Sequence, residues 1–219
     1  MNESAEFSSI LTCRFSPLSQ LSVETVSELL HHYELLVRWN KSLNLTSIAD
    51  LEGAVLRHYC ESLFLGIRLP TEAVSVLDVG SGAGFPGIPL AILRPDCRIT
   101  LAESHKRKAV FLREATRHLS NVRVAACRAE EVEGTFDWVV SRAVRWLDVL
   151  KVAEGGNFGR ACSGAGAPSG TTRRCASLGL LLGQDDAADV VHQPIFDWGP
   201  PIPLPWGHRR VLLLGQATA

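Results

Sequence analysis

The stretch that decides the fold runs Val76-Leu77-Asp78-Val79-Gly80-Ser81-Gly82-Ala83-Gly84-Phe85-Pro86-Gly87. Its first residues predict a strand that passes directly into a glycine-rich turn and then into a helix that Pro86 can start. Without a Cβ, Gly80, Gly82 and Gly84 can adopt positive φ and leave space for a ligand beside the backbone. Amides at the start of the helix then point inward. The turn therefore predicts a nucleoside-binding loop.

Two kinds of ligand compete for this turn. The segment from Gly82 to Gly87 satisfies the dinucleotide fingerprint GxGxxG, and the acidic Glu103 follows sixteen residues later. Asp78 favours another ligand, because a carboxylate two residues before the first glycine suits a cationic amino-acid group and is poorly suited to a pyrophosphate. An acid-GxGxG turn resembles motif I of class I S-adenosylmethionine-dependent methyltransferases. That resemblance implies S-adenosylmethionine as the cofactor.

Outward from the turn, short apolar runs alternate with helical patterns, as in βαβ units on a parallel sheet. The right-handed crossover rule then predicts a doubly wound, Rossmann-like three-layer αβα sandwich. The expected strands are Ser75–Val79, Arg98–Glu103, Asn121–Ala126, Phe136–Val140, Leu178–Leu182 and Val211–Leu214. The expected helices run from about Pro86 to Arg94, Lys106 to Leu119 and Ala143 to Leu150.

The N-terminal part has a different pattern. Apolar residues follow a 3.6-residue period from Ser22 to Asn40, behind a serine N-cap, and a second helical pattern runs from Asp50 to about Gly66. We therefore predict an N-terminal helical cap over residues 1–70 and a methyltransferase domain over residues 71–219. Residues 157–177 are rich in Gly, Ala, Ser and Thr and predict a flexible loop or a sequence irregularity.

Composition limits the protein class. The chain has 219 residues, a net charge of −1 and 46% hydrophobic residues, which is typical of a globular chain with a sizeable core. No apolar run approaches the roughly 18 residues of a membrane span, and acids stand where a secretory signal needs basic residues, so we expect a cytoplasmic protein. Six cysteines without a CxxC pair predict neither a metal site nor a disulfide framework.

Several polar residues are placed at the carboxyl edge of the expected sheet. Glu103 ends the second strand, where it can bind both ribose hydroxyls; a solvated strand-end acid is the structural alternative. The segment Arg128-Ala129-Glu130-Glu131 follows the third strand and is placed to line an adenine pocket. Arg142 ends the fourth strand and can orient the substrate or pair with a cofactor carboxylate. Its alternative role is a salt bridge to Asp78 or Glu103.

Other residues leave two interpretations open. The run His105-Lys106-Arg107-Lys108 places several cations on one helix, which indicates either an RNA-binding surface or a solvated face. Arg209 and Arg210 can extend that surface. His58 is either a hydrogen-bonded core histidine or a site residue.

Beyond these patterns, the chain resembles the RsmG/GidB family of bacterial 16S ribosomal RNA guanine-N7 methyltransferases. The residues that carry the resemblance are Trp39-Asn40-Lys41-Ser42-Leu43-Asn44-Leu45-Thr46, His58-Tyr59-Cys60-Glu61-Ser62-Leu63, Asp78 to Pro89, Glu103 to Lys108, Arg128 to Glu131 and Phe136 to Ala143. The resemblance implies methyl transfer from S-adenosylmethionine to N7 of a guanine in the decoding-region loop of 16S ribosomal RNA.

The resemblance also implies roles for individual residues. Gly80, Phe85, Ala129, Glu130 and Arg142 match positions that hold the cofactor. The turn adds Gly82 to this set, and the end of the second strand adds Glu103. Lys106, Arg128 and Arg209 match positions expected to meet the RNA or the target base. The chain departs from the family at Glu61, where an aspartate is usual, and after Glu154-Gly155-Gly156.

The expected chemistry needs no general base, because guanine N7 has a free lone pair and no proton to lose. Arg128 and Arg142 are candidates for orienting the base. We expect the partner to be 16S ribosomal RNA or the small ribosomal subunit, with no membrane and no metal, and the protein to be a monomer. Three alternatives remain: a methyltransferase acting on another substrate, a nicotinamide-dependent oxidoreductase and a non-enzymatic RNA-binding module.

Overall fold

The computed structural model describes residues 2–48, 50–155 and 177–217. Its helices are α1 Glu3–Phe15, α2 Val23–Leu43, α3 Leu51–Ala54, η1 Val55–Cys60, α4 Glu61–Gly66, α5 Gly87–Leu93, α6 Lys106–Ala115, η2 Ala129–Glu131, α7 Trp146–Gly155 and α8 Gln184–Val190. Its strands are β1 Ser75–Val79, β2 Arg98–Ala102, β3 Val122–Ala125, β4 Trp138–Arg142, β5 Ser177–Gly183, β6 Phe196–Trp198, β7 Ile202–Pro203 and β8 Arg210–Ala217. The loop expected at 157–177 lies outside these residues, apart from Ser177.

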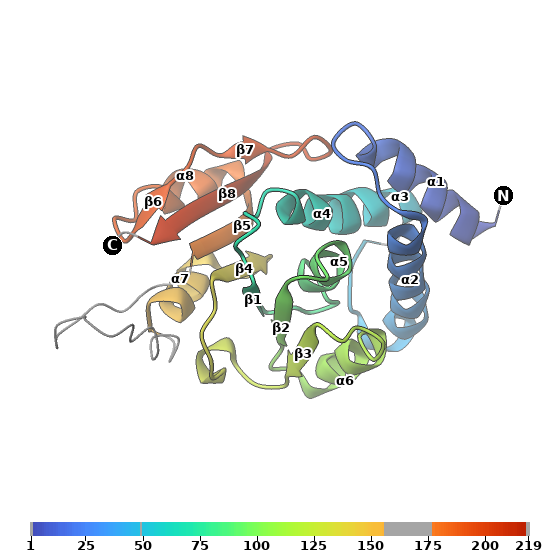
Figure 1. Ribbon diagram of the computed structural model, residues 1–219, viewed down its shortest axis with the longest axis horizontal. Coiled ribbons are helices and arrows are strands. Elements are labelled where there is room, and N and C mark those ends of the chain that lie inside the picture. Colours follow the sequence, from blue (N-terminus) through green and yellow to red (C-terminus); the bar gives the residue numbers. More distant parts are fainter. Residues whose placement is uncertain (1, 49, 156–176, 218–219) are drawn as a thin grey trace.

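The strands form one mixed sheet in the order β3-β2-β1-β4-β5-β8-β6, with β7 paired to β8 (Figure 1). The first five strands are parallel, whereas β8 runs antiparallel to β5 and to β6. The β1 strand occupies the position beside both β2 and β4, where the order of the strands reverses. In open α/β sheets this is the place where ligands bind, at the carboxyl ends of the strands.

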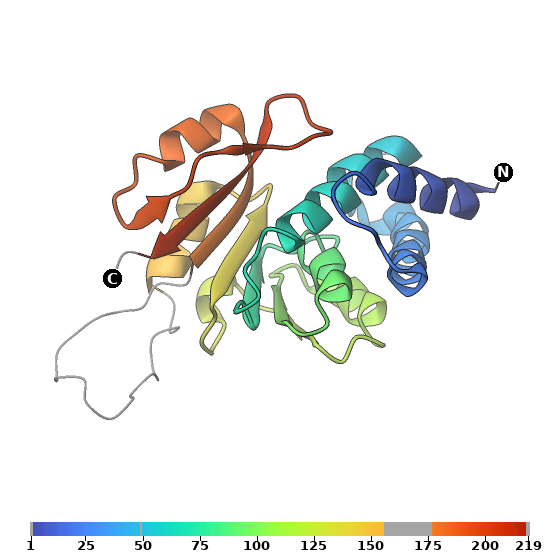
Figure 2. The same ribbon diagram turned by 45° about the horizontal axis from the view of Figure 1, so that its top comes forward.

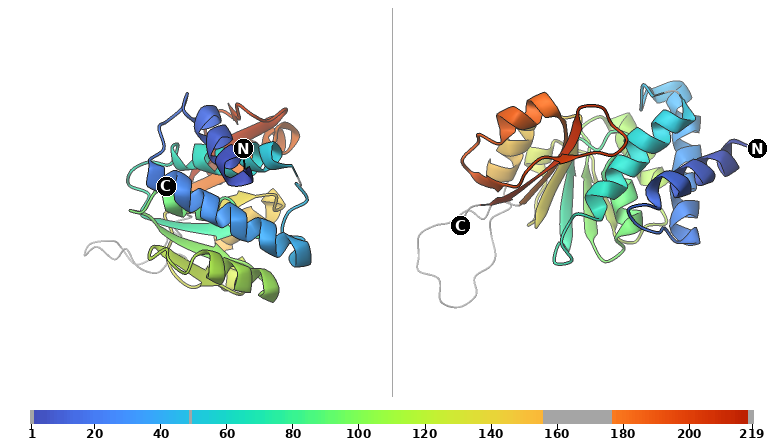
Figure 3. Two further views of the ribbon diagram at one scale, coloured as in Figure 1. Left: turned by 90° about the vertical axis from the view of Figure 1, so that its right-hand side faces the viewer. Right: turned by 90° about the horizontal axis from the view of Figure 1, so that it is seen from above.

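Helices cover both faces of the sheet, which confirms the predicted three-layer arrangement (Figure 3, right). One apolar cluster joins α1, α2, α4, α5 and α6 to side chains on one face, including Val76 of β1. A second cluster joins α7 and α8 to the opposite face, including Leu77 of β1. Adjacent residues of β1 thus enter different cores, as the alternation of side chains along a strand requires.

The first helix of the chain was missed by the sequence analysis. The Asn2 side chain accepts a hydrogen bond from the Ala5 amide at 2.9 Å and begins α1, in which Phe7, Leu11 and Phe15 are fully buried. This spacing of four residues is a helical signal in itself. The predicted serine cap of α2 is confirmed, since Ser22 Oγ accepts from the Thr25 amide at 3.1 Å. These helices share a core with the sheet, and the division at residue 70 stays a prediction.

Two predicted boundaries near the site were wrong. The fourth strand was expected to begin at Phe136, but β4 begins at Trp138, because the carboxylate of Asp137 accepts from the amides of Val74 and Ser75. The next helix was expected from Ala143, but α7 begins at Trp146. Ala143 has a φ of 61°, which is incompatible with a right-handed helix. Arg142 consequently ends a strand and is followed by a tight bend.

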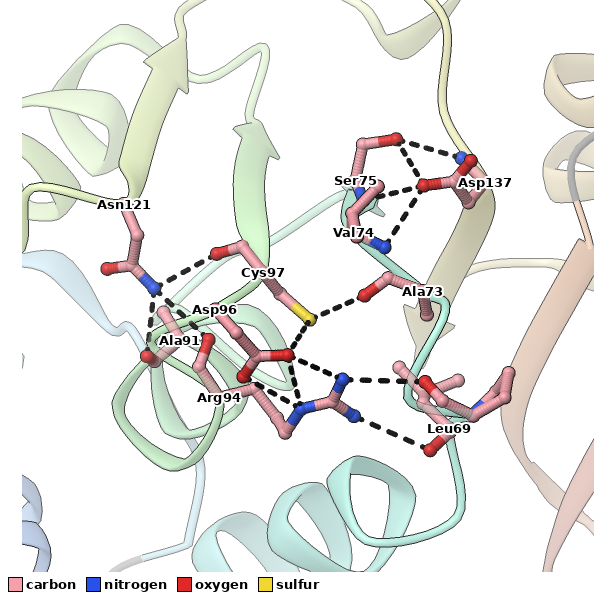
Figure 4. Close-up of polar contacts among 11 residues, drawn as sticks. Leu69, Ala73, Val74, Ser75, Ala91, Arg94, Asp96, Cys97, Asn121 and Asp137 are labelled. Atoms are coloured by element: carbon pink, nitrogen blue, oxygen red, sulfur yellow. Dashed lines mark hydrogen bonds and ion pairs between the residues drawn. The ribbon is translucent and has the colours of Figure 1, made fainter.

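The edge of the sheet opposite the glycine turn is fixed by polar contacts (Figure 4). Asn121 Nδ2 donates to the carbonyl oxygens of Ala91, Arg94 and Cys97 at 3.0, 3.3 and 3.1 Å. The Arg94 guanidinium pairs with Asp96 and reaches the chain between α4 and β1. This edge is therefore occupied by structural contacts.

At the C-terminal end, β5 and β8 contain the two strands expected from the sequence. Helix α8 and strand β6 were not predicted from the sequence, and neither was the short strand β7. Figures 1 and 2 show α8 beside β5 and β8, at the end of the molecule away from α1. None of the helices in the described part of the chain has the length and apolar character that crossing a membrane requires.

Candidate functional site

The glycine turn adopts the left-handed backbone that its sequence predicts. Gly80, Gly82 and Gly84 have φ values of 69°, 55° and 90°. A Cβ added at Gly80 would lie 2.6 Å from Val144, and one at Gly84 would lie 2.4 Å from Ile88. A Cβ at Gly82 would meet nothing closer than the Gly80 carbonyl oxygen at 3.8 Å. Gly82 is thus the glycine that faces open space.

The Asp78 carboxyl lies behind the turn. It is fully buried, its Oδ2 accepts a hydrogen bond from the Gly87 amide at 3.1 Å, and its Oδ1 has no partner among the described residues. Burial is the main cause that raises the pKa of Asp78 to about 7. In this position the carboxyl holds the start of α5 against β1, and it does not line the space in front of the turn.

A hollow of about 430 Å³ opens in front of the turn, which we call the glycine-loop hollow. It brings together four of the predicted cofactor residues, Gly80, Gly82, Phe85 and Arg142. Its other walls are Leu45, Thr46, Ser47, Ile48, Arg57, His58, Ser81, Ala83, Lys108, Ala143 and Arg210. The basic lining residues are Arg57, Lys108, Arg142 and Arg210, and no lining residue is acidic. The hollow therefore favours an anionic group.

His58 joins the turn to Arg142. Its ring stacks on Phe85 with centroids 4.6 Å apart, and Arg142 Nη1 donates to its Nδ1. His58 Nε2 therefore carries the proton and donates to Thr46 Oγ1 at 2.7 Å. Burial, followed by the positive charge of Arg142, lowers the pKa of His58 to about 3. His58 is thus a neutral, hydrogen-bonded residue that also lines the hollow, which combines the two interpretations left open by the sequence.

A buried carboxylate behind the hollow pairs with two arginines. Glu61 is fully buried, and its Oε2 lies 2.8 Å from Arg210 Nη2 and 3.5 Å from Arg142 Nε. Burial is the main cause that lowers the pKa of Arg142 to about 10, and the charge of Glu61 opposes it. The expected alternative partners of Arg142, Asp78 and Glu103, are not its ion-pair partners. In the sequence Glu61 stands out only as a departure from the family, and this role was not predicted.

Helix α2 also reaches the turn. His32 is buried, its Nε2 lies 3.0 Å from the Ala83 carbonyl oxygen, and the Tyr59 hydroxyl lies 2.9 Å from its Nδ1. Since the carbonyl can only accept, Nε2 donates, and Nδ1 accepts from the Tyr59 hydroxyl. Burial lowers the pKa of His32 to about 3, so the ring is neutral. His32 was not predicted from the sequence, where it reads as one more position of an amphipathic helix.

Glu103 lies beside the hollow at the end of β2. Its Oε2 accepts from the Gly82 amide at 2.9 Å and its Oε1 from the His105 amide at 2.7 Å. Each carboxylate oxygen has a second lone pair for a ribose hydroxyl. Glu103 is buried, with 7% of the residue exposed, so the alternative of a solvated acid is wrong.

The remaining predicted residues lie outside the glycine-loop hollow. Ala129 is buried at the start of η2, whereas Arg128 and Glu130 are exposed beside it. Lys106 is exposed at the start of α6, and it is Lys108 that lines the hollow. Arg209 is exposed and pairs with Asp185 at 2.6 Å, while Arg210 turns inward as the first residue of β8. The signal for Arg210 was the start of the apolar run at Val211.

Comparison with known proteins assigns the family. The family described as GidB, rRNA small subunit methyltransferase G, matches residues 25–154, which include β1, the glycine turn, β2, β3 and β4. The chain belongs to this family. A relative named ribosomal RNA small subunit methyltransferase G from Xanthomonas campestris pv. campestris is 42% identical over 142 residues, which are 63% of this chain and 66% of the relative. A relative of the same name from Xanthomonas oryzae pv. oryzae is 39% identical over 164 residues, 72% of this chain and 76% of that one.

Solved structures share the fold at low sequence identity. A SAM-dependent methyltransferase from Aquifex aeolicus matches with a TM-score of 0.55 and 13% identity, over 76% of this chain and 93% of that one. A SAM-dependent O-methyltransferase from Thermotoga maritima matches with a TM-score of 0.52 and 12% identity, over 84% and 72%. The predicted class I, Rossmann-like methyltransferase fold is confirmed.

Proposed function

We propose that this protein transfers the methyl group of S-adenosylmethionine to N7 of a guanine in the decoding-region loop of 16S ribosomal RNA. The observation that carries the proposal is the glycine turn, in which Gly82 faces a hollow bordered by Phe85, His58 and Arg142. Family membership supports it, because the relatives are named ribosomal RNA small subunit methyltransferase G.

The residues around the turn fit this cofactor. A side chain at Gly82 would extend into the hollow, so the missing Cβ leaves room for the methionine part. Arg142 lines the hollow, and the hollow is basic, as a carboxylate requires. Glu103 follows β2 directly and the Ala129–Glu130 segment follows β3, the neighbouring strand, and these are the places where the ribose and adenine are expected.

The chain has to align and shield the reaction. When bound, S-adenosylmethionine supplies an electrophilic methyl: the N7 lone pair forms the new N–C bond, the C–S bond breaks with its electron pair left on sulfur, and no proton moves. Alignment of this kind supplies about 7–11 kcal/mol in favourable cases. Arg142 is held rigidly by Glu61 and His58, which suits it to fix the cofactor carboxylate or the base. Arg128, which is exposed, is proposed to contact the RNA.

The same proposal includes partners and organisation. The partner is 16S ribosomal RNA or the small subunit that contains it, met by Lys106, Arg128 and Arg209, and the protein acts as a cytoplasmic monomer. Helices α1 to α4 form a cap over residues 1–70, and residues 71–219 carry the methyltransferase domain. The exposed cations of α6 support the RNA contact, since they are not needed for the packing of that helix.

Calorimetry and a methyl-transfer assay test the proposal. We expect S-adenosylmethionine to bind, Arg142→Gln to weaken binding by at least tenfold, and tritiated methyl groups to appear at guanine N7 in small subunits that lack the modification. The assay also offers naked 16S ribosomal RNA and a protein extract, and a fluorescence titration offers NADH. Label in the protein extract alone would contradict the RNA substrate, and binding of NADH without S-adenosylmethionine would contradict the methyltransferase activity.

A further inference from the structure

A second cavity, of about 520 Å³, lies at the carboxyl ends of β4 and β5, and we call it the β5 cavity. It is lined by Ala143, Val144, Arg145, Trp146, Leu147, Leu181, Leu182, Gly183, Asp186, Asp189 and Arg210. Ala143 and Arg210 also line the glycine-loop hollow, so the two spaces are neighbours. The family match assigns no role to this cavity.

The order of the strands places the β5 cavity beside the methyl group. The expected adenine and ribose positions follow β3 and β2, the glycine turn follows β1, and Arg142 ends β4. A cofactor bound along this edge has its adenine next to β3 and its amino-acid end, with the sulfonium, next to β4. The next space along the edge, after β4, is the β5 cavity. An acceptor base held there lies next to the group it receives.

The walls of the β5 cavity have the chemistry of a guanine site. Trp146 begins α7 and is partly exposed, which offers an aromatic surface for stacking. Asp186 and Asp189 stand on α8, and neither forms an ion pair with another described residue. A carboxylate can accept from both N1–H and the N2 amino group of guanine. Adenine and cytosine each present a ring-nitrogen acceptor beside their amino group, so a carboxylate disfavours them.

Asp186 is the better placed of the two acids. Asp186 is exposed in the first turn of α8, and its Oδ2 lies 3.8 Å from the position of a Cβ at Gly183, so the carboxylate borders the cavity at the end of β5. A guanine bound through N1 and N2 presents its opposite edge, which carries N7, away from this carboxylate. Ala143 and Arg210 lie between the cavity and the glycine-loop hollow, so N7 then faces the methyl donor.

We propose that the β5 cavity holds the target guanine, with the Asp186 carboxylate accepting from N1–H and the N2 amino group. This inference rests on the proposed function and names the residue that selects the base. Arg210 is kept in place by its pair with Glu61 and borders both spaces. Asp186 is therefore a specificity-determining residue that contacts the substrate.

The test compares Asp186→Asn with a matched control, Asp148→Asn. Asp148 lies on α7, pairs with Lys151 at 3.7 Å and does not line the cavity. In single-turnover assays with unmethylated small subunits, we expect Asp186→Asn to lower the rate about 10- to 100-fold. Asp148→Asn is expected to match the unsubstituted protein. Calorimetry with S-adenosylmethionine is expected to give the same affinity for all three, which shows that the variants are folded.

Small subunits reconstituted with inosine at the target position provide the decisive comparison, because inosine keeps N7 and N1–H but lacks the N2 amino group. The unsubstituted protein is expected to prefer guanine about tenfold, and Asp186→Asn is expected to lose most of that preference. An unchanged rate or an unchanged guanine preference in Asp186→Asn would overturn the inference while leaving the proposed function intact. Failure of the unsubstituted protein to methylate guanine would instead overturn the proposed function.

Discussion

At the scale of single residues, Gly82 and Gly84 of the turn differ in what surrounds them. A methyl at Gly84 would meet Ile88 at 2.4 Å, whereas one at Gly82 would project into the hollow. We expect Gly82→Ala to lower the free energy of unfolding by only about 1–2 kcal/mol, because of its positive φ, and to weaken S-adenosylmethionine binding. Gly84→Ala is expected to destabilise the fold more. Urea unfolding measures the stability of both variants, and calorimetry measures their binding of S-adenosylmethionine. Equal losses of stability in the two variants would contradict the difference between the two glycines.

The Asp78 carboxyl gives a pH dependence. Burial raises its pKa from 3.8 to about 7, so between about pH 4 and 7 the folded chain keeps a proton that the unfolded chain has released. The free energy of unfolding contributed by this group is therefore expected to fall as the pH rises through that range. Asp78→Asn removes the titration and keeps an acceptor for the Gly87 amide. In urea unfolding, the substitution should increase the free energy of unfolding more at pH 7.5 than at pH 4.5. An equal change at both pH values would contradict the raised pKa of Asp78.

At the scale of elements, His32 connects α2 to the glycine turn. His32→Phe would leave the Ala83 carbonyl and the Tyr59 hydroxyl buried without this partner. Each such loss costs about 1–3 kcal/mol, so we expect thermal stability to fall and S-adenosylmethionine to bind more weakly. The neighbouring His31 is exposed and provides the control His31→Phe. If both variants bind the cofactor equally, α2 does not support the turn.

Glu61 connects α4 to β4 and β8. Glu61→Gln would leave Arg142 and Arg210 without a buried counter-charge. Breaking a buried ion pair in this way lowers the free energy of unfolding by about 3–5 kcal/mol. Because Arg210 is partly exposed, we expect a loss near the lower end of this range. Glu61→Asp keeps the charge and is the conservative control. Chemical denaturation measures both, and similar stabilities for the Gln and Asp variants would show that the charge is unimportant.

At the scale of the whole molecule, the net charge of −1 means that RNA must meet a local basic surface. Lys106, Arg128 and Arg209 are all exposed on the described surface. Replacing each with Gln is expected to weaken RNA binding and to reduce the slope of log affinity against log salt by up to about 0.7–0.9 per phosphate contact. The control is Arg98→Gln, since Arg98 is exposed at the start of β2, at the opposite edge of the sheet. Unchanged slopes would contradict the RNA contacts.

The part of the fold that the sequence predicted is the part built from local repeats. Strands β1 to β4 and helices α5 and α6 follow the alternation of apolar runs that any βαβ unit must show. The errors lie where a long-range contact sets the boundary. Asp137 caps the backbone of β1 and so delays β4, and Ala143 adopts positive φ at the bend. Helix α1 was missed although its apolar spacing was visible.

The sequence by itself determined the glycine turn, the carboxyl edge on which it lies and the family, because these depend on residues within a short stretch of chain. Only the tertiary structure decided that Asp78 supports the turn from behind, and that Glu61 pairs with Arg142 and Arg210. Such partners lie in different elements, and their pairing follows from strand order and shared burial. A buried charge is stabilised by an opposite charge that lies close to it in space, and the distance between two residues in space cannot be read from their separation in the sequence.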